Sequence, residues 1–278
     1  MRIGIFTTIT DEGMEPGELA IEIEARGFES LFVPEHTHIP VTIETVHPGW
    51  DEIPRDYCRS LDPFVALSFA AAATRDLRIG TAVALLVQRD PITFAKEAAT
   101  LDRASGGRLE LGIGVGWLRE EIRNHGTDPR TRVALQGERI QAVKKIWTEV
   151  QAEFHGKYVA FDPIHSWPKP LQRPHPPLWL GGWGPSTHAR VLDHADGWMA
   201  PTMLGVEELH QGIGELNRLA AQLGRAPVPV TATILEPRPG DIERRLDLGA
   251  HRVLLGLLPA AGRATTLRRL DRLAALIA

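Results

Sequence analysis

Short apolar runs rich in β-branched residues alternate along this chain with longer amphipathic segments. Apolar runs of about four to eight residues, bounded by turn-forming residues, are typical of the buried strands of a parallel sheet. Such strands are expected at residues 2–7, 30–33, 78–84, 108–115, 178–181, 197–200, 228–234 and 252–257. Helices are expected at residues 16–26, 62–74, 90–104, 135–147, 206–223, 241–248 and 263–278, with a further one capped by Ser186 or Thr187. The pattern therefore predicts eight strand–helix units.

The local signals at the helix ends support these boundaries. Two helices are expected to open with Asp-Pro, at Asp62-Pro63 and Asp90-Pro91. Aspartate is a preferred N-cap residue, and proline fits the first helical position because its missing N–H has no partner there anyway. Gly27 is expected to end the first helix in a left-handed conformation.

Eight strand–helix units in 278 residues predict the α/β class and a closed (β/α)8 TIM barrel rather than an open sheet. An open dinucleotide-binding sheet usually carries G-x-G-x-x-G after its first strand, and residues 7–13 lack that motif. We expect a single barrel domain over residues 1–278, with loop insertions near 34–60 and 150–177 and an irregular stretch at 154–177. The site of such a barrel lies at the carboxyl ends of its strands. Those ends are at residues 7–8, 35–38, 82–85, 114–117, 181–184 and 199–202.

The composition of the chain limits the classes of molecule that it is expected to bind. The formal net charge of −4 does not favour binding to nucleic acid or to an anionic membrane. A single cysteine, Cys58, excludes an intramolecular disulfide. The first seven residues read as a strand and not as a signal peptide, so we expect a cytoplasmic protein with a small-molecule substrate.

Two of the expected strands run into glycines. Gly114 and Gly116 follow one strand, while Gly181, Gly182 and Gly184 follow another and precede a helix. Glycine lets a flat or phosphorylated ligand lie against the backbone, and free N–H groups at a helix start favour an anion. Close packing of a helix against a strand would also require glycines. These two glycine-containing segments therefore predict cofactor binding, with close packing of a helix against a strand as the alternative.

Several strings together resemble the bacterial luciferase-like superfamily, especially its branch that uses the deazaflavin coenzyme F420. They lie at residues 27–36, 77–83, 89–91, 96–108, 111–121 and 174–184. The resemblance covers about residues 1–200 well and the last quarter loosely. It implies a (β/α)8 barrel, a homodimer, and either F420 or FMN bound at the mouth of the barrel.

The resemblance also implies roles for particular residues. Glu35 and His36 would meet the ring of the cofactor and are the candidate catalytic residues, His36 for proton transfer. Ala82 and Val83 would form a bulge with a non-proline cis peptide behind the ring. The full set of cofactor-binding residues that it implies is Glu35, His36, Ala82, Val83, Val115, Gly116, Trp117, Gly181, Gly182, Trp183 and Gly184.

Trp117 departs from part of the family. The deazaflavin-dependent sugar-phosphate dehydrogenases of the superfamily have a glutamate acid at this position, and a tryptophan cannot transfer that proton. Trp117 is expected to stack on substrate instead. Together with Trp50, Trp183 and the 34–60 loop it would form the wall of the substrate site.

A metal-dependent hydrolase is an alternative of another class, because His36-x-His38 resembles the metal pair of zinc-dependent barrel hydrolases. In those enzymes the pair follows the first strand, whereas here it follows the second. The histidines at 125, 155, 165, 175 and 194 are not expected at strand ends, so no metal is predicted. Asp102, Arg103 and Arg108 lie at the opposite end of the barrel and are interpreted as a structural ion-pair turn.

The combined prediction is an F420-dependent oxidoreductase that transfers hydride between C5 of the deazaflavin and a small, fairly apolar organic substrate. The first alternative is an FMN-dependent luciferase-like monooxygenase with the same site. A metal-dependent barrel hydrolase and a barrel that binds flavin without turnover are the remaining alternatives.

Overall fold

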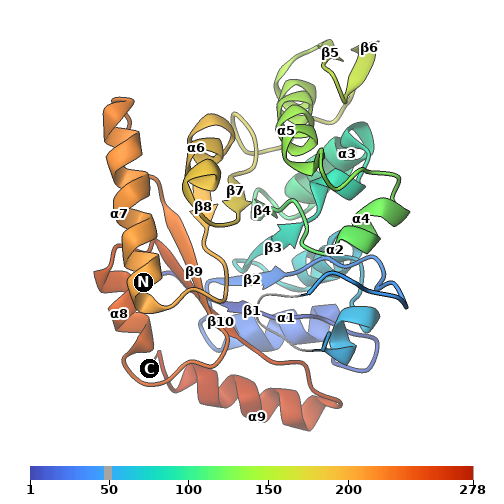
Figure 1. The fold of residues 1–278 in the computed structure, drawn as a ribbon. Helices are drawn as coiled ribbons and strands as arrows, with labels where there is room; N and C mark the ends of the chain where they lie inside the picture. Colours follow the sequence, from blue (N-terminus) through green and yellow to red (C-terminus); the bar gives the residue numbers. More distant parts are fainter. Residues whose placement is uncertain (47–51, 278) are drawn as a thin grey trace.

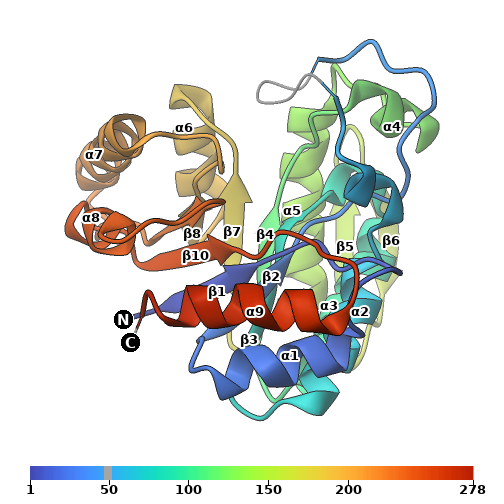
Figure 2. The ribbon, with the colours of Figure 1, turned by 90° about the horizontal axis from the view of Figure 1, so that it is seen from below.

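Parallel strands close into a barrel with helices on its outside (Figures 1 and 2), as the strand–helix alternation predicts. The computed structural model describes residues 1–46 and 52–277. The order of strands around the barrel is β1-β10-β9-β8-β7-β4-β3-β2. Their bounds are β1 (Ile3–Phe6), β2 (Ser30–Val33), β3 (Arg78–Ala84), β4 (Leu109–Ile113), β7 (Leu178–Gly181), β8 (Gly197–Met199), β9 (Val230–Ile234) and β10 (Arg252–Gly256).

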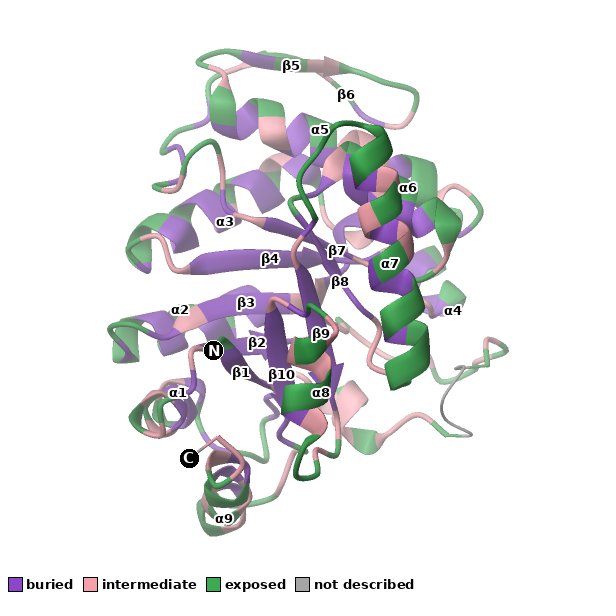
Figure 3. Ribbon diagram, turned by 90° about the vertical axis from the view of Figure 1, so that its left-hand side faces the viewer, coloured by how far each residue is buried: buried purple, intermediate pink, exposed green. Residues whose placement is uncertain are grey.

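The helices form the outer layer and are α1 (Pro16–Ala25), α2 (Pro63–Ala73), α3 (Pro91–Ala104), α4 (Arg119–Asn124), α5 (Arg132–Thr148), α6 (Pro185–His194), α7 (Val206–Gln222), α8 (Asp241–Asp247) and α9 (Arg263–Ala274). Two 3-10 helices, η1 (Arg55–Arg59) and η2 (Leu86–Gln88), lie in the loops after β2 and β3. The strands are buried, while the outer faces of helices such as α7 and α8 are exposed (Figure 3). Among the helices of the described residues, none has both the length and the apolar character that a membrane crossing requires.

The expected caps are present. The carboxylate of Asp62 accepts hydrogen bonds from the backbone N–H groups of Phe64 and Val65, at 2.9 and 3.0 Å. Asp90 accepts one from Thr93 N–H at 2.8 Å. Gly27 has a φ of 80° after α1. The caps are local, and for this reason the sequence located them correctly.

The segments between the strands differ from the sequence analysis in one helix that was missed and two expectations that were wrong. Helix α4 was not predicted, and α6 begins at Pro185 with Gly184 in the N-cap position instead of Ser186 or Thr187. The stretch expected to be irregular contains an antiparallel hairpin of β5 (Ala152–His155) and β6 (Ala160–Ile164). Its turn is held from α5, where Glu138 accepts hydrogen bonds from the N–H groups of Lys157, Tyr158 and Val159.

The interpretation of Asp102 and Arg108 as an ion-pair turn was wrong in its chemistry, although both are structural. The buried carboxylate of Asp102 accepts hydrogen bonds from the N–H groups of Leu171 and Gln172, at 2.6 and 2.9 Å. Arg108 donates to the carbonyl oxygens of Ala71 and Leu77, at 2.7 and 2.8 Å. Both side chains therefore satisfy backbone groups, of loops and of the last turn of α2, at the amino end of the barrel.

The first and last units of the barrel are joined by ion pairs between α9 and α1, which lie side by side in Figure 2. Arg263 pairs with Glu18 and Glu22, and Arg26 pairs with Asp271 at 2.8 Å. These exposed pairs each contribute little to stability.

A buried ionic network fills the amino end of the barrel interior. Arg252, at the start of β10, is fully buried and donates to Glu110 on β4 at 2.7 and 2.8 Å, and to Glu29 at 2.8 and 3.0 Å. Glu110 also pairs with Arg78 and accepts from Nε1 of Trp179 at 2.7 Å. Burial tends to raise the pKa of Glu110, but the hydrogen bonds and charge of Arg252, with Arg78, outweigh it and lower that pKa. These buried charged side chains thus occupy the interior at the end opposite the one where the site is expected.

Candidate active site

A pocket of about 750 Å³ opens at the carboxyl ends of the barrel strands. This volume is within the usual range for small-molecule sites. Most of the side chains that line it are apolar, and they come from every strand end around the barrel. They include Phe6, Pro34, Val83, Leu85, Val115, Trp117, Met199, Leu235 and Leu257, with Thr7, Thr8, Glu35, His36, Asp56, Tyr57 and Glu236 as polar members. The predicted location of the site is therefore a real concavity.

The bulge expected on β3 is confirmed. The peptide bond between Ala82 and Val83 is cis, the register of β3 against β4 shifts between Thr81 and Ala84, and both Ala82 and Val83 line the pocket. The side chain of Val83 packs against the neighbouring strand ends. A Cβ on Gly114 would clash with Val83, and one on Gly181 would lie 3.2 Å from it. Close contact with Val83 on β3, rather than the expected packing of a helix against a strand, therefore accounts for these two glycines.

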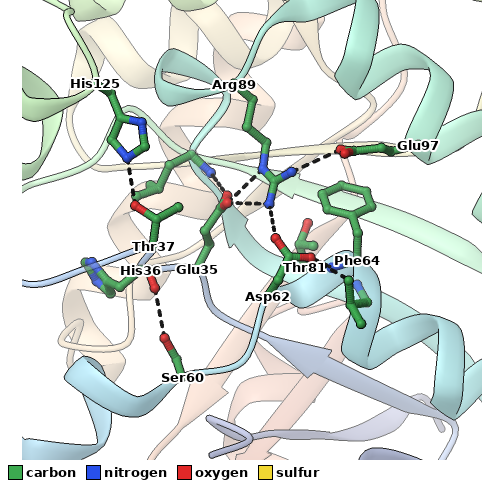
Figure 4. A network of polar contacts seen from close by, with 12 residues as sticks. Glu35, His36, Thr37, Ser60, Asp62, Phe64, Thr81, Arg89, Glu97 and His125 are labelled. Atoms are coloured by element: carbon green, nitrogen blue, oxygen red, sulfur yellow. Dashed lines mark hydrogen bonds and ion pairs between the residues drawn. The ribbon is translucent and has the colours of Figure 1, made fainter.

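Glu35 is held in a buried ion pair (Figure 4). Its side chain is inaccessible to solvent, one carboxylate oxygen accepts from Arg89 at 2.6–2.7 Å, and the other accepts from Leu85 N–H at 2.6 Å. Arg89 also pairs with Asp62 at 2.7 Å and with Glu97 at 3.0 Å. With both oxygens engaged, Glu35 ties the end of β2 to the loop after β3. The geometry favours this positioning role over the predicted acid–base role.

His36 lies at the edge of the pocket with one ring nitrogen fixed. Its Nδ1 is 2.8 Å from Oε2 of Glu121, and the Glu121 carboxylate is buried on α4. The other oxygen, Oε1, accepts from Thr37 N–H at 3.1 Å. An ionised carboxylate can only accept, so the proton on a neutral His36 ring is assigned to Nδ1. This tautomer leaves the lone pair on Nε2, which makes Nε2 the nitrogen able to take up a proton.

Two aromatic side chains flank His36. The ring of Tyr57, from η1, has its centroid 4.8 Å from that of His36, and the ring of Trp117 lies edge-on at 6.1 Å. Burial raises the pKa of Tyr57 to about 12. Tyr57 is therefore neutral at physiological pH, and neither ring competes with His36 as a base.

The histidines near His36 form a hydrogen-bonded group around Thr37. Ligand-type atoms of His38, Glu121 and His125 lie within 4.8 Å of one another and could hold a metal ion. The Thr37 hydroxyl is 2.7 Å from Nε2 of His125, 3.0 Å from Nδ1 of His38 and 3.5 Å from Oε1 of Glu121. One hydroxyl can accept from both rings and donate to the carboxylate, so these groups are satisfied without an ion.

This arrangement bears on the hydrolase alternative. His125 was not expected near a strand end, but it caps α4 beside Thr37 (Figure 4). Within residues 1–46 and 52–277, the cluster with metal-ligand spacing contains His38 and not His36. The H-x-H sequence therefore does not form the joint metal pair that a barrel hydrolase would need. That catalysis requires no metal stays a prediction.

The loop after β7 is only partly in the pocket. Gly181 and Gly182 line it, with Gly182 at φ 126° and Gly184 at φ 92°. Trp183 was expected in the substrate wall, but its indole stacks on Trp198 at 5.9 Å and packs over Gly212 of α7. Trp183 and Gly184 are not among the residues that line the pocket. Trp50, also expected in that wall, lies outside the described residues.

Two residues of the site were missed. Glu121 was part of a quoted string but was given no role, and Tyr57 lies in a loop without a recognisable motif. Glu121 is 85 residues from His36 in the sequence, and no local spacing connects them. Only the convergence at the barrel mouth of the segments that follow β2 and β4, on either side of β3, brings the two together.

Comparison with known proteins agrees with this architecture. A model of the luciferase-like monooxygenase family matches residues 1–237. An uncharacterized protein of Mycobacterium tuberculosis is 38% identical over 284 residues, covering 100% of this chain and 99% of that protein. The oxygenase component of a flavin-dependent trigonelline monooxygenase of Acinetobacter baylyi is 32% identical over 159 residues, covering 56% of this chain and 44% of that protein.

Solved structures share the fold at lower identity. A monooxygenase from Streptomyces bottropensis superposes with a TM-score of 0.81 at 20% identity, covering 100% of this chain and 98% of that one. An F420-dependent secondary alcohol dehydrogenase, in complex with an F420–acetone adduct, superposes with a TM-score of 0.78 at 18% identity, covering 100% of this chain and 99% of that one. At these identities the superpositions show the fold and not the cofactor.

Proposed function

This chain belongs to the luciferase-like monooxygenase family, and we propose that it is an F420-dependent oxidoreductase acting on a small, apolar organic substrate. The observation that carries the proposal is His36, held at Nδ1 by buried Glu121 on the rim of a largely apolar pocket. A hydride transfer to or from a carbon that bears oxygen requires a group that gives or takes one proton, and His36 is placed to do so.

The shape of the pocket supports a flat ring as its occupant. Ala82 and Val83 of the β3 bulge line the pocket, and so do Val115, Gly116 and Gly182. Gly116 and Gly182 both have positive φ, at 73° and 126°, a conformation that favours glycine. Because glycine has no side chain, a ligand can approach the backbone at these two points. These residues, with Trp117 and the backbone at Glu35, would hold the ring. When bound, the deazaflavin would exchange hydride at C5.

The chain's own groups would supply the remaining chemistry. Glu121 fixes the tautomer and orientation of His36, and Nε2 takes the substrate proton in oxidation or returns it in reduction. The apolar lining excludes water and favours a substrate without charge. Trp117 stands where the sugar-phosphate dehydrogenases of the superfamily have a glutamate acid. We therefore do not propose a sugar-phosphate dehydrogenase activity for this chain.

An FMN-dependent monooxygenase with the same pocket is the second candidate. The similarity to the oxygenase component of a flavin-dependent monooxygenase over 159 residues favours it. This reaction needs a reduced flavin that reacts with oxygen, which a deazaflavin does poorly. The two candidates therefore differ in the ring that the pocket prefers.

Fluorescence titration of the purified protein with F420 and with FMN tests the cofactor. We expect F420 to bind more tightly than FMN. Micromolar binding of FMN without detectable binding of F420 would replace the proposal with the monooxygenase. An absorption spectrum of the protein after addition of each cofactor gives an independent measurement of the same preference.

We further propose a homodimer, supported by the outer face of α2. Val65 and Phe69 on that helix are 58% and 61% exposed, and Ile21 on the adjacent α1 is 50% exposed. A second copy that covers these side chains would remove exposed apolar surface from water.

Phe69→Glu is expected to convert the dimer to a monomer, since it would bury a charge in the interface. Light scattering after size-exclusion chromatography measures the mass. Leu223→Glu is the matched control, because Leu223 is 62% exposed at the end of α7, which lies across the barrel from α2. A wild-type monomer, or a Phe69→Glu variant that stays dimeric, would contradict the assignment of this face.

A further inference from the structure

A group of side chains of the kind that bind metals lies beside the pocket, between the loop after β2 and α4. His38 comes from the loop, whereas Glu121 and His125 come from α4 and its C-cap position. Ligand atoms of the three residues lie within 4.8 Å of one another. Two imidazoles and one carboxylate are a donor set that zinc-class divalent ions take, with water as a further ligand. The proposed proton transfer uses neither of these histidines, and none of the three residues lines the pocket.

The local structure of α4 explains why two of the ligands lie together. Glu121 and His125 are four residues apart, and the N–H of His125 donates to the carbonyl oxygen of Glu121 at 3.3 Å. Side chains at this spacing lie on one face of a helix. That face is directed toward the loop after β2, because the N–H of Thr37 donates to the Glu121 carboxylate at 3.1 Å. One helical turn therefore presents an imidazole and a carboxylate to the loop that carries His38.

The three ligand atoms face one common point, which the hydroxyl of Thr37 occupies. Oγ1 of Thr37 lies 2.7 Å from Nε2 of His125 and 3.0 Å from Nδ1 of His38. It lies 3.5 Å from Oε1 of Glu121. Bonds from zinc to nitrogen and oxygen ligands are about 2.0–2.2 Å long, so binding requires the ligands to approach the point by roughly 1 Å. Rotation of the Thr37 side chain to another staggered rotamer would remove the hydroxyl from the point.

Groups around the cluster hold two of the ligands in suitable orientations. Nε2 of His38 lies 2.9 Å from the side-chain amide of Asn124. An amide offers an oxygen as well as an NH₂ group, so Asn124 can accept from Nε2–H, which leaves the lone pair of Nδ1 facing the common point. On the other side, His36 holds Oε2 of Glu121 at 2.8 Å, and Oε1 is the oxygen directed at Thr37. Outer hydrogen bonds of this kind orient the ligands of protein metal sites.

The burial of the cluster is suited to an ion that enters from solvent. The side chain of Glu121 is 1% exposed, whereas His38 is half-buried and His125 is exposed. The buried carboxylate supplies negative charge to a dication. The exposed imidazole leaves a path for the ion and a position for a water ligand.

We propose that His38, Glu121 and His125 bind a divalent ion of the zinc class in place of the Thr37 hydroxyl. The ion joins the loop after β2 to α4 beside the candidate active site. It takes no part in the proposed proton transfer, so turnover is expected without it. The inference does not depend on the identity of the cofactor or of the substrate.

Calorimetric titration with Zn²⁺, on protein first treated with a chelator and then freed of it, tests the site. We expect one saturable site per chain in the wild type. His38→Gln and His125→Gln should each weaken binding by about 100-fold or more, since even the loss of an outer partner costs about 10- to 100-fold in metal affinity. The matched control is His155→Gln, which should bind as the wild type does. His155 is exposed and lies 3.8 Å from Glu153, and these two belong to no group of three ligands among the described residues.

Thr37→Ala distinguishes an ion site from a network that serves only to hold the loop. The substitution removes the hydroxyl from the common point and leaves all three ligands in place. We therefore expect this variant to bind Zn²⁺ at least as tightly as the wild type. Weaker binding would contradict the replacement of the hydroxyl by the ion.

A second measurement identifies the ligand at position 125 directly. His125→Cys replaces one zinc ligand with another, so it should recover affinity that His125→Gln loses. With Co²⁺ as the probe, His125→Cys should show the absorption of a cobalt–thiolate bond, which the wild type lacks because its site offers only nitrogen and oxygen atoms. This signal also decides the question if His38→Gln does not fold, as judged by circular dichroism.

No saturable binding of Zn²⁺ to the wild type, or binding that both glutamine variants retain, would overturn the proposal. An equal loss of affinity in His155→Gln and His125→Gln would also overturn it. The titrations use protein without cofactor or substrate, so their result is independent of the cofactor test. A failure to bind both F420 and FMN would refute the proposed function and would not affect the ion site.

Discussion

His36→Ala is expected to lower turnover by roughly 10²–10⁴-fold, the usual contribution of a general acid or base. Cofactor affinity should fall much less, because the ring would be held mainly by the β3 bulge and the rim of the pocket. The large loss of turnover is expected because Nδ1 of His36 is paired with Glu121 at 2.8 Å. This pairing leaves Nε2 as the nitrogen that transfers the proton. Among the other titratable side chains of the lining, Glu35 is bound to Arg89 and Tyr57 stays neutral.

Steady-state kinetics across pH, with cofactor binding measured separately, tests this prediction. The pH profile of turnover of the variant should differ from that of the wild type, because the group that transfers the proton is gone. His38→Ala is the matched control, because His38 is two residues away and does not line the pocket. If affinity fell in step with turnover, His36 would be a binding residue. If activity were unchanged, Asp56 or Glu236 of the lining would become the candidate.

Arg252→Met is expected to lower the free energy of unfolding by about 3–5 kcal/mol at neutral pH, as for other broken buried ion pairs. The substitution leaves the carboxylates of Glu110 and Glu29 without their main partner. It also removes the guanidinium that lies over the rings of Phe32 and Trp179, at 5.2 and 5.6 Å. Urea unfolding of both proteins measures the difference, with Arg268→Met, on the exposed face of α9, as the control.

The pH dependence of this effect has a definite sign. The pKa of Glu110 in the folded protein lies below its ordinary value of 4.5. A lowered pKa stabilises the folded state above that ordinary value, and the contribution is lost as the pH falls through the folded pKa. The difference between wild type and Arg252→Met should therefore shrink below about pH 4.5. A difference that is small at neutral pH, or that grows in acid, would contradict the role of the network.

What the sequence by itself determined about this protein is set by interactions between near neighbours. The apolar runs located the barrel strands. A strand that is buried on both faces consists largely of consecutive apolar residues, and such a run is visible in the sequence. Asp62, Asp90 and Gly27 located helix ends, because capping involves only the next few residues. Once the units were recognised as a parallel barrel, the strand ends were predicted to meet, and the pocket with His36, Val83 and Gly182 lies there.

Only the tertiary structure decided which side chains act together. The partner of His36 is Glu121 on another strand–helix unit, and the carboxylate of Glu35 proved to be held by Arg89. The same holds for Arg190 with Gln136, and for Arg252 with Glu110. Trp183, which sequence reasoning placed in the pocket, turns instead toward α7. The physical reason is that a side chain's direction, and the neighbour that compensates its charge, depend on burial and on pairing across units. No local pattern encodes either of these.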